Sequence, residues 1–542
     1  MKQSNGLKQS AAAVGLWVGA QSALALPPTT PLPDAAHTIY LAGGAAQDPA
    51  LDKLIADNLA ASGTLDIYYD NGNPNGSKYR AYFFTTNTSK VPGLSSASVN
   101  VLIYKRSNGG AGYGVIPLIQ DPPPTVKQLD FTPANSWTFD ATNNRYVVSG
   151  TQTGQYADAG ITGVNPSILT GGNYPQPSGT GVGDVFSTTE TVPSEVSARL
   201  AVTPAGGLTY GLAVTKDFYK VLQAAQIYSG TLPSTTPLGS YNQAARIPTL
   251  TRQFAASLIA GKIKSWDSVV VFNSAGVGKT LPEIASANGI TLPTQVGSGS
   301  SAVSPVSMGN RNKGAAVGAA FSAKLLNYPT LASAFPPASQ PTLLNPLALP
   351  YVTQAPGASQ QEQVLLDWQN GTNVSGLNPP AVSGGTPPKR WGVAEQSTDW
   401  NPSYAKDYRY VRIDSYAPTL ANIHIGGYPL WAEQTLQWRK TYTGATATFT
   451  GLIPTGDKLL ILKKLAAVLG SPSAAAQVNA QLGSVIGATG LFGVSTDSSV
   501  KTLSAAFDPN NPIIPYTHVN GALNDWLLPV VNGGKLGTVK LP

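Results

Sequence analysis

Four short stretches of this sequence have residue types and spacings suited to holding a small anion. Residues 109–114 read GGAGYG, a run in which successive backbone N–H groups can converge on one anion as a nest. Residues 297–301 read GSGSS, a glycine turn that carries hydroxyl donors. A flexible hairpin loop explains the first run equally well, so its composition leaves both interpretations open.

The other two stretches carry charged side chains. Asp158 lies among small residues at the end of a predicted strand, where a carboxylate can accept a hydrogen bond from a protonated ligand; a turn-capping aspartate is the alternative. Arg311 and Lys313 stand just before a predicted helix of small residues. A planar guanidinium at that place can clamp an oxyanion through two hydrogen bonds, whereas a solvated basic turn is the alternative.

The element that positions the first glycine run is predicted at residues 39–59. Ile39 to Leu41 reads as a buried strand, Gly43-Gly44 as a turn, and Asp48 as the N-cap of a helix with Pro49 in its first position. A strand followed by a helix N-terminus presents backbone N–H groups and a partial positive charge. The unit predicts an α/β fold, although most α/β proteins begin this way without binding a ligand there.

Hydrophobic periodicity predicts the remaining elements. The turn-rich segment 308–321 is expected to lead into a helix, and Pro429 is expected to begin an amphipathic helix that runs to Lys440. Thr251 is a predicted N-cap, with Gly261 closing its helix. Other predicted strands are 99–104 and 208–214, and other predicted helices are 215–227, 362–368, 458–469 and 474–486.

The N-terminus has the pattern of an export signal. Lys2 and Lys8 precede an apolar run at 11–20, and Ala23 to Ala25 offers a small-residue cleavage site, so residues 1–25 are expected to be a signal peptide. No later stretch reaches the length of a membrane span. The chain has no cysteine, which excludes disulfides and an acylated lipid anchor. We therefore expect a protein without a membrane anchor, located in the periplasm or secreted.

Composition narrows the functional classes. Only 11% of the residues are charged and the net charge is +7, without a basic cluster, so nucleic-acid binding is not expected. Three histidines without helical spacing do not predict a metal site, and no cofactor is expected. No Ser-His-Asp spacing, nucleophile elbow or P-loop is present, so we expect no enzyme. The length exceeds one hydrophobic core, which predicts two lobes.

Five segments together resemble a known family. They are AGGAAQD at 42–48, YKRSNGGAGYGV at 104–115, YADAGITGVNP at 156–166, LTRQFAASLIAGKIKSWDS at 250–268 and VRIDSYAPTLANIHIGGYPLW at 411–431. In sequence and order they are similar to the type 2 periplasmic-binding-protein superfamily, specifically its phosphate-binding-protein branch. The C-terminal hundred residues resemble extended, secreted relatives of that branch.

The resemblance implies an α/β fold of two lobes with a ligand cleft between them. Lobe 1 would comprise residues 26–225 and 396–542, and lobe 2 residues 226–395. The ligand would be held largely by helix N-termini and backbone N–H groups. Position by position, the implied ligand contacts are Ala45, Ala46, Gly110, Ala111, Asp158, Thr162, Arg311, Gly314 and Ala315. Whether GSGSS at 297–301 or RNKGAA at 311–316 forms the anion loop of the second lobe stays open.

Some hydroxyl groups of the family pattern are absent. Phosphate binders place a hydroxyl in the glycine run, where this chain has Gly110 or Ala111, and a Gly-Ser-Gly-Thr after the arginine, where it has residues 314–316, GAA. Each charge-assisted bond not made costs on the order of 1–3 kcal/mol. Thr162, Ser298 or Ser300 would be substitute donors.

Two functions follow from this pattern. The first is an exported solute-binding protein that holds phosphate or a similar small oxyanion between two lobes, without chemistry, and with an inner-membrane ABC transporter as its candidate partner. The second is an extracellular structural, adhesion or assembly protein that retains the fold and has lost the ligand. Missing hydroxyls and long segments rich in Gly, Pro, Ser and Thr favour the second; Asp158 and Arg311 favour the first.

Overall fold

The computed structural model describes most of the chain. The described residues are 32–45, 48–70, 78–130, 137–149, 152–174, 193–329, 333–341, 343–482, 490–495 and 506–517. The expected signal peptide and Ala46 lie outside these ranges.

Within the described residues, fifteen strands form one mixed sheet. Those on its main path are β1 (Thr38–Gly43), β2 (Asp66–Asp70), β3 (Tyr79–Asn87), β4 (Ser98–Arg106), β6 (Trp137–Asp140), β7 (Arg145–Val148), β9 (Ala159–Thr162), β10 (Leu200–Thr215), β14 (Ser307–Arg311), β15 (Tyr351–Ala355), β16 (Gly392–Ser397) and β19 (Trp431–Arg439). Their spatial order is β15-β14-β16-β10-β19-β9-β1-β4-β3-β2-β7-β6. Three further strands, attached directly or through one another to β10, are β17 (Tyr408–Tyr410), β20 (Leu491–Ser495) and β21 (Ile513–Thr517).

Three two-stranded sheets and a set of helices complete the structure. The small sheets pair β5 (Val126–Leu129) with β8 (Gln152–Gln155), β11 (Thr249–Leu250) with β18 (Arg412–Ile413), and β12 (Val270–Phe272) with β13 (Gly278–Thr280). The α-helices are α1 (Asp48–Asn58), α2 (Ile116–Ile119), α3 (Pro193–Arg199), α4 (Lys216–Tyr228), α5 (Arg252–Ile259), α6 (Leu281–Ala287), α7 (Ala316–Phe321), α8 (Ala358–Asn370), α9 (Leu420–His424), α10 (Ala447–Gly451), α11 (Gly456–Leu469) and α12 (Pro472–Leu482).

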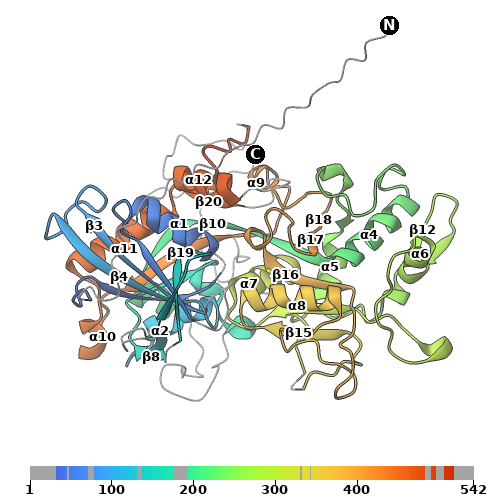
Figure 1. The fold of residues 1–542 in the computed structure, drawn as a ribbon, viewed down its shortest axis with the longest axis horizontal. Coiled ribbons are helices and arrows are strands. Elements are labelled where there is room, and N and C mark those ends of the chain that lie inside the picture. Colours follow the sequence, from blue (N-terminus) through green and yellow to red (C-terminus); the bar gives the residue numbers. More distant parts are fainter. Residues whose placement is uncertain are drawn as a thin grey trace, which may run out of the picture.

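The molecule has two halves that share this sheet (Figure 1). One half contains β1 to β9 with α1, α2 and α11, and the other contains β14 to β16 with α4 to α8. The expected two-lobed α/β fold is confirmed. The lobe limits expected from the sequence stay a prediction.

Two long strands connect the halves. β10 pairs with β19 through residues 200–209 and then with β16 through residues 210–214, so a single strand belongs to both halves. β19 in turn pairs with β9 of the first half. The halves are therefore joined by hydrogen-bonded strands at the centre of the sheet.

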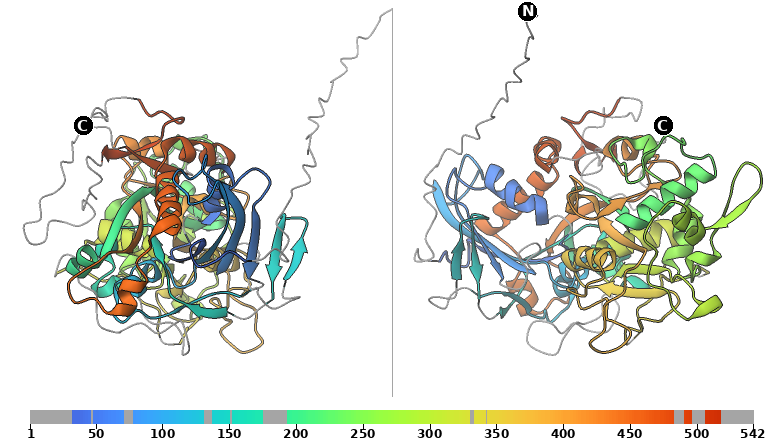
Figure 2. Two further views of the ribbon diagram at one scale, coloured as in Figure 1. Left: turned by 90° about the vertical axis from the view of Figure 1, so that its left-hand side faces the viewer. Right: turned by 45° about the vertical axis from the view of Figure 1, so that its right-hand side comes forward.

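Helices bury their apolar faces on each half of the sheet. Leu51, Leu54 and Ile55 of α1 share one core with Ile461 and Leu465 of α11, so the C-terminal helices stabilise the first half. Figure 2 shows these orange and red helices beside the blue strands. In the second half Trp368 of α8 packs against Gly392, where a Cβ would lie 2.0 Å from the indole ring.

Several sequence predictions hold and two fail. The Thr251 hydroxyl accepts from the N–H of Phe254, which confirms the predicted cap of α5. The helix predicted from Pro429 to Lys440 is wrong, because residues 431–439 form β19, buried between two neighbouring strands. The segment predicted as a turn from Met308 is also partly wrong, because it begins within β14.

Within the described residues, no individual helix has the length and apolar character needed to cross a membrane. The pair α11 and α12, bent by 61° at a short break, meets the length and composition requirements only when the two helices are taken together.

Candidate functional site

Each half contains a place where the strand order reverses. β1 lies between β4 and β9, and both strands pair with it in parallel. Likewise β14 lies between β15 and β16, again in parallel. In open α/β sheets, ligands bind beyond the carboxyl ends of parallel strands at such reversals. The reversal points are Gly43-Gly44 after β1 and Arg311 at the end of β14.

The loops beyond these two strand ends touch each other. The backbone N–H of Gly112 donates to the carbonyl oxygen of Gly314 at 2.8 Å. A Cβ at Gly110, whose φ is +83°, would lie 3.0 Å from that same oxygen and 3.2 Å from the Cα of Ala315. Ala111 in turn lies under Gly44, whose added Cβ would be 3.8 Å from its Cα. The structure thus brings Gly110, Ala111, Gly314 and Ala315 together, and one of the amides near them is already bonded within the chain.

A cavity of about 180 Å³ opens beside this contact, at the carboxyl ends of β14 and β15. It is lined mainly by the second half, with Asn173 contributed by the first. Its charged lining residues are Arg311, Lys313 and Glu395, and Asn310 lies in the same wall. Glycine, alanine and proline residues form much of the remaining wall. The other lining residues carry polar groups, among them Asn312, Ser322, Ser339 and Gln354.

Arg311 is the main cation of this cavity. Its side chain is 8% exposed and its Nε donates to the carbonyl of Ala355 at 3.1 Å. Burial lowers its pKa to about 10, while the charges of Glu395 and Tyr210 raise it. The guanidinium is therefore positively charged at neutral pH despite its burial.

Glu395 is the acid of the same cavity. Its side chain is 1% exposed and its Oε2 accepts from the backbone N–H of Arg311 at 3.1 Å. Burial raises its pKa to about 7, whereas the N–H bond and the charge of Arg311 lower it. The carboxyl group consequently exchanges its proton near neutral pH, and it meets Arg311 through the backbone rather than through the guanidinium.

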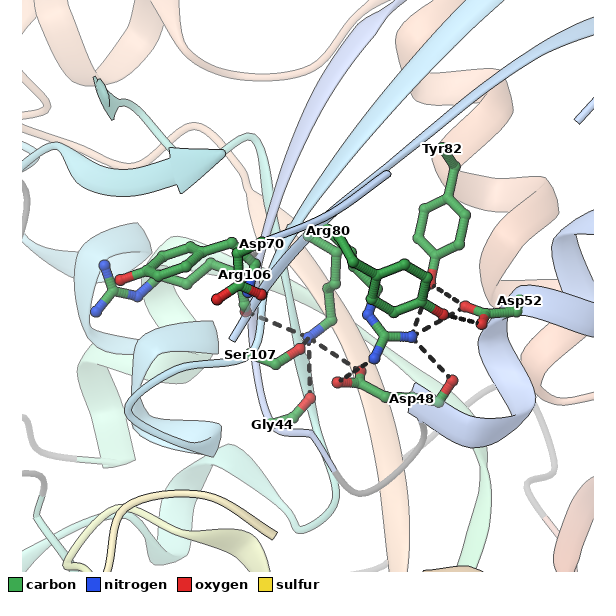
Figure 3. A network of polar contacts seen from close by, with 11 residues as sticks. Gly44, Asp48, Asp52, Asp70, Arg80, Tyr82, Arg106 and Ser107 are labelled. Carbon is green, nitrogen blue, oxygen red and sulfur yellow. Dashed lines mark hydrogen bonds and ion pairs between the residues drawn. The ribbon is translucent and has the colours of Figure 1, made fainter. Parts of the chain in front are cut away.

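A second polar cluster lies at the start of α1 (Figure 3). The Nζ of Lys105, fully buried at the end of β4, donates to the carbonyl of Gly44 at 2.9 Å and to the hydroxyl of Ser107 at 2.8 Å. It also lies 3.6 Å from Oδ1 of Asp48. Burial lowers the pKa of Lys105 to about 8, and Asp48 raises it.

Arg80 completes this cluster. It lies 3.4 Å from Oδ2 of Asp48 and donates to Asp52 at 2.9 Å, and Tyr82 also donates to Asp52 at 2.7 Å. Burial opposes the charge of Arg80, but Asp48 and Asp52 raise its pKa. The N-terminus of α1, expected to face a ligand, thus carries the carboxylate of Asp48 held by two buried cations.

Comparison with known proteins finds similarity only among solved structures. No protein-family model matches the chain, and no curated protein matches it. A phosphate ABC transporter substrate-binding protein of Clostridium perfringens, solved with bound phosphate, matches with 10% identity over 80% of this chain and 96% of its own, at a TM-score of 0.34. A phosphate-binding protein of Stenotrophomonas maltophilia matches with 10% identity over 77% and 82%, at 0.31. PstS of Borrelia burgdorferi matches with 10% identity over 79% and 96%, at 0.28.

The chain is similar to phosphate-binding proteins. This is the branch that the sequence segments resemble. At these identities the likeness concerns the course of the chain.

Two of the expected ligand contacts have partners within the chain. Asp158 accepts from the backbone N–H of Tyr40 at 2.9 Å and pairs with Lys458 of α11 at 2.8 Å. Burial raises its pKa and Lys458 lowers it. The Thr162 hydroxyl, fully buried, lies 2.7 Å from that of Thr435. The structure places Asp158 level with the middle of β1 rather than at its carboxyl end.

The two possible anion loops of the second half differ in position. Residues 311–315 line the cavity and touch the glycine run. GSGSS forms a turn between Val296 and Val303, which pair with each other, and its residues 298–301 are exposed. Of the two segments, only RNKGAA therefore lies at the cavity. Ala45, an expected ligand contact of the first half, directly follows Gly44 in the chain and is partly buried.

Sequence reasoning missed Glu395, Lys105 and Arg80. Each is a charged residue inside a strand of largely apolar neighbours, GVAEQS, SVNVLIYKR and YRAYFFTTN. A charge in a strand that reads as buried needs a partner or a function. A charged residue within a largely apolar strand was therefore the sequence signal that could have identified these three residues. Among the described residues no group of three His, Asp or Glu side chains forms a possible metal site.

Proposed function

We propose that this chain is an exported solute-binding protein that holds a small anion, phosphate or a similar group, in the cavity beside β14, without chemistry. The observation that carries the proposal is Arg311, a buried arginine at a strand reversal that lines a cavity at the contact of the two halves. The names of two similar solved structures, a phosphate ABC transporter substrate-binding protein and a phosphate-binding protein, agree with this proposal.

The physical argument rests on the cost of a buried cation. A charged group in a protein interior requires hydrogen bonds or a counter-charge. Arg311 uses its Nε and backbone N–H internally. An anion in the cavity would accept from the rest of the guanidinium, and hydrogen bonds to charged groups contribute about 1.5–3 kcal/mol each.

Titration calorimetry of the purified protein tests this function. We expect heat of binding with at least one of phosphate, sulfate, methyl phosphate or a short carboxylate, and at least a tenfold loss of affinity in Arg311→Gln. Arg252→Gln is the matched control, because Arg252 is an exposed arginine of the same half. Equal binding by both variants would exclude Arg311 as the anchor.

The second candidate function is a structural or interaction role that has lost the ligand. Two observations favour it: Gly112 bonds directly to Gly314 across the halves, and Asp48 supplies its own carboxylate to Lys105 and Arg80. A protein that binds none of the tested anions, and that assembles on the cell exterior, would support this alternative.

Location and transport partner are part of the same proposal. A periplasmic or secreted location follows from the N-terminal pattern, and an ABC transporter of the inner membrane would receive the solute. Fractionation of cells that express the full chain tests the location, and crosslinking in the presence of the bound solute tests the partner. Recovery of the uncleaved chain in the cytoplasm would contradict both.

A further inference from the structure

The cavity beside β14 carries charges of both signs. Arg311 and, at its exposed edge, Lys313 are cations, whereas Glu395 is an acid buried in the same wall. A site built for a bare oxyanion places donors around it, and an ionised carboxylate there repels the ligand. Glu395 can therefore accept nothing from sulfate, and from the phosphate dianion it can accept only the hydrogen bond of its single P–OH group.

A second acceptor lies in the same wall. Asn310 is 2% exposed, and its Nδ2 donates to the carbonyl of Ala338 at 2.6 Å. That bond fixes the amide orientation, and its Oδ1 is buried with no hydrogen-bond partner among the described residues. Buried polar atoms are nearly always satisfied, by protein, water or a ligand. Glu395 and Asn310 thus both offer oxygens to a donor.

The size of the cavity also exceeds that of an inorganic oxyanion. An apolar cavity of about 150 Å³ is large enough for benzene, with six heavy atoms. The present cavity has about 180 Å³. Phosphate and sulfate have five heavy atoms and would leave part of this space unfilled.

We infer that the solute is a small organic acid that also carries a hydrogen-bond donor, a hydroxyl or an ammonium group. Its anionic group binds Arg311, and its donor binds Glu395 and Asn310. This inference rests on the proposed solute-binding function and specifies the class of solute. Because the pKa of Glu395 is close to neutrality, its carboxylate is available to accept from such a donor at pH 8.

Matched pairs of probes test the donor directly. Calorimetry of the full protein at pH 8 would compare butyrate with 3-hydroxybutyrate and 3-aminobutyrate, and propyl phosphate with glycerol 1-phosphate. The two series separate a carboxylate from a phosphate head group. We expect the donor-bearing member of at least one series to bind about tenfold or more tightly than its donor-free partner.

A substitution of Glu395 should affect the affinities of the two members of a probe pair differently. Glu395→Gln keeps the shape and removes the negative charge, so it is expected to weaken the donor-bearing probe and to leave the donor-free probe unchanged or bound more tightly. A general loss of structure would weaken both. Asn310→Ala is the second variant and is expected to reduce the same preference without changing the binding of the donor-free probe.

The outcomes distinguish this inference from the proposed function. Donor-free and donor-bearing probes that bind equally, with affinity still dependent on Arg311, would overturn the inference and leave the function standing. The same holds if phosphate or sulfate binds more tightly than every organic probe. If no probe binds in a manner that depends on Arg311, the proposed function fails and the inference fails with it.

Discussion

The backbone N–H of Gly112 donates a hydrogen bond of 2.8 Å to the carbonyl of Gly314, and these residues belong to different halves of the molecule. The bond joins the loop after β4 to the loop after β14. It is the contact beside which the cavity with Arg311 opens, because Gly314 belongs both to this hydrogen bond and to the cavity wall.

Gly110→Ala is expected to strain this contact. A side chain at φ +83° costs about 1–2 kcal/mol, and the added Cβ would lie 3.0 Å from the Gly314 oxygen, which adds an overpacking cost of about 1–3 kcal/mol. Gly63→Ala is the control, because Gly63 has φ +74° and open space around the added atom. Urea denaturation measures both, and equal losses in the two variants would show that the loops yield without cost.

Asp48→Ala is expected to destabilise the first half. It leaves Arg80 and Lys105 buried without the carboxylate between them, and removing one partner of a buried pair costs about 3–5 kcal/mol. Asp57→Ala is the matched control, since Asp57 pairs with Lys53 at the exposed surface of the same helix, where a pair contributes about 0–1 kcal/mol. Denaturation midpoints that shift equally would contradict the proposed importance of the cluster.

Glu395→Gln is expected to change how stability depends on pH. The pKa is raised from 4.5 to about 7, so the folded state holds more protons than the unfolded state in this window. The contribution of the Glu395 carboxyl group to the free energy of unfolding is complete below pH 4.5 and is lost as pH rises through 7. The loss is on the order of 3 kcal/mol. Glu395→Gln lacks this loss. The free energy of unfolding of the variant, relative to that of the native chain, should therefore be higher at pH 8 than at pH 4.5.

Glu283→Gln is a comparison variant for that measurement, because Glu283 contributes a pH dependence of stability with the opposite sign. Glu283 is exposed in the capping box of α6, and hydrogen bonds from Thr280 lower its pKa. Its contribution is present above the unfolded pKa and is lost as pH falls. An unchanged pH profile in Glu395→Gln would show that the carboxyl group is not the titrating group at this site.

Asp158→Asn and Lys458→Met are expected to be non-additive. The two side chains pair at 2.8 Å and connect α11 to the sheet next to β1. Residues in contact show coupling energies of about 0.5–3 kcal/mol in a double-mutant cycle. Such coupling, together with unchanged anion affinity in both single variants, would assign Asp158 to stability; an affinity loss confined to Asp158→Asn would instead support its expected ligand contact.

The sequence predicted local structure where local signals dominate. Thr251 and the apolar residues that follow it define α5, because a cap and a periodic face require only neighbouring residues. The helix predicted after Pro429 failed, since the central position of β19 between β9 and β10 imposes extended structure on residues whose own pattern is ambiguous.

The candidate site was harder to predict because its parts are distant in the chain. Arg311 was recognised from its type and its place before a helix. Glu395 was not, since its proximity to Arg311 depends on the parallel pairing of β14 with β16. The contact of Gly112 with Gly314 likewise depends on how the halves meet, and no spacing in the sequence encodes it.

The membership of β10 in both halves has a mechanical consequence. A loop hinge swings by rotating a few backbone dihedrals, but β10 is hydrogen-bonded to β19 up to residue 209 and to β16 from residue 210, so the halves can separate only if this continuous strand bends or twists together with its partners. Separation of the halves is then a stiff, collective deformation, and thermal energy would produce it rarely. A molecule enclosed beside β14 would on this view remain there for many cycles of local motion before it could leave.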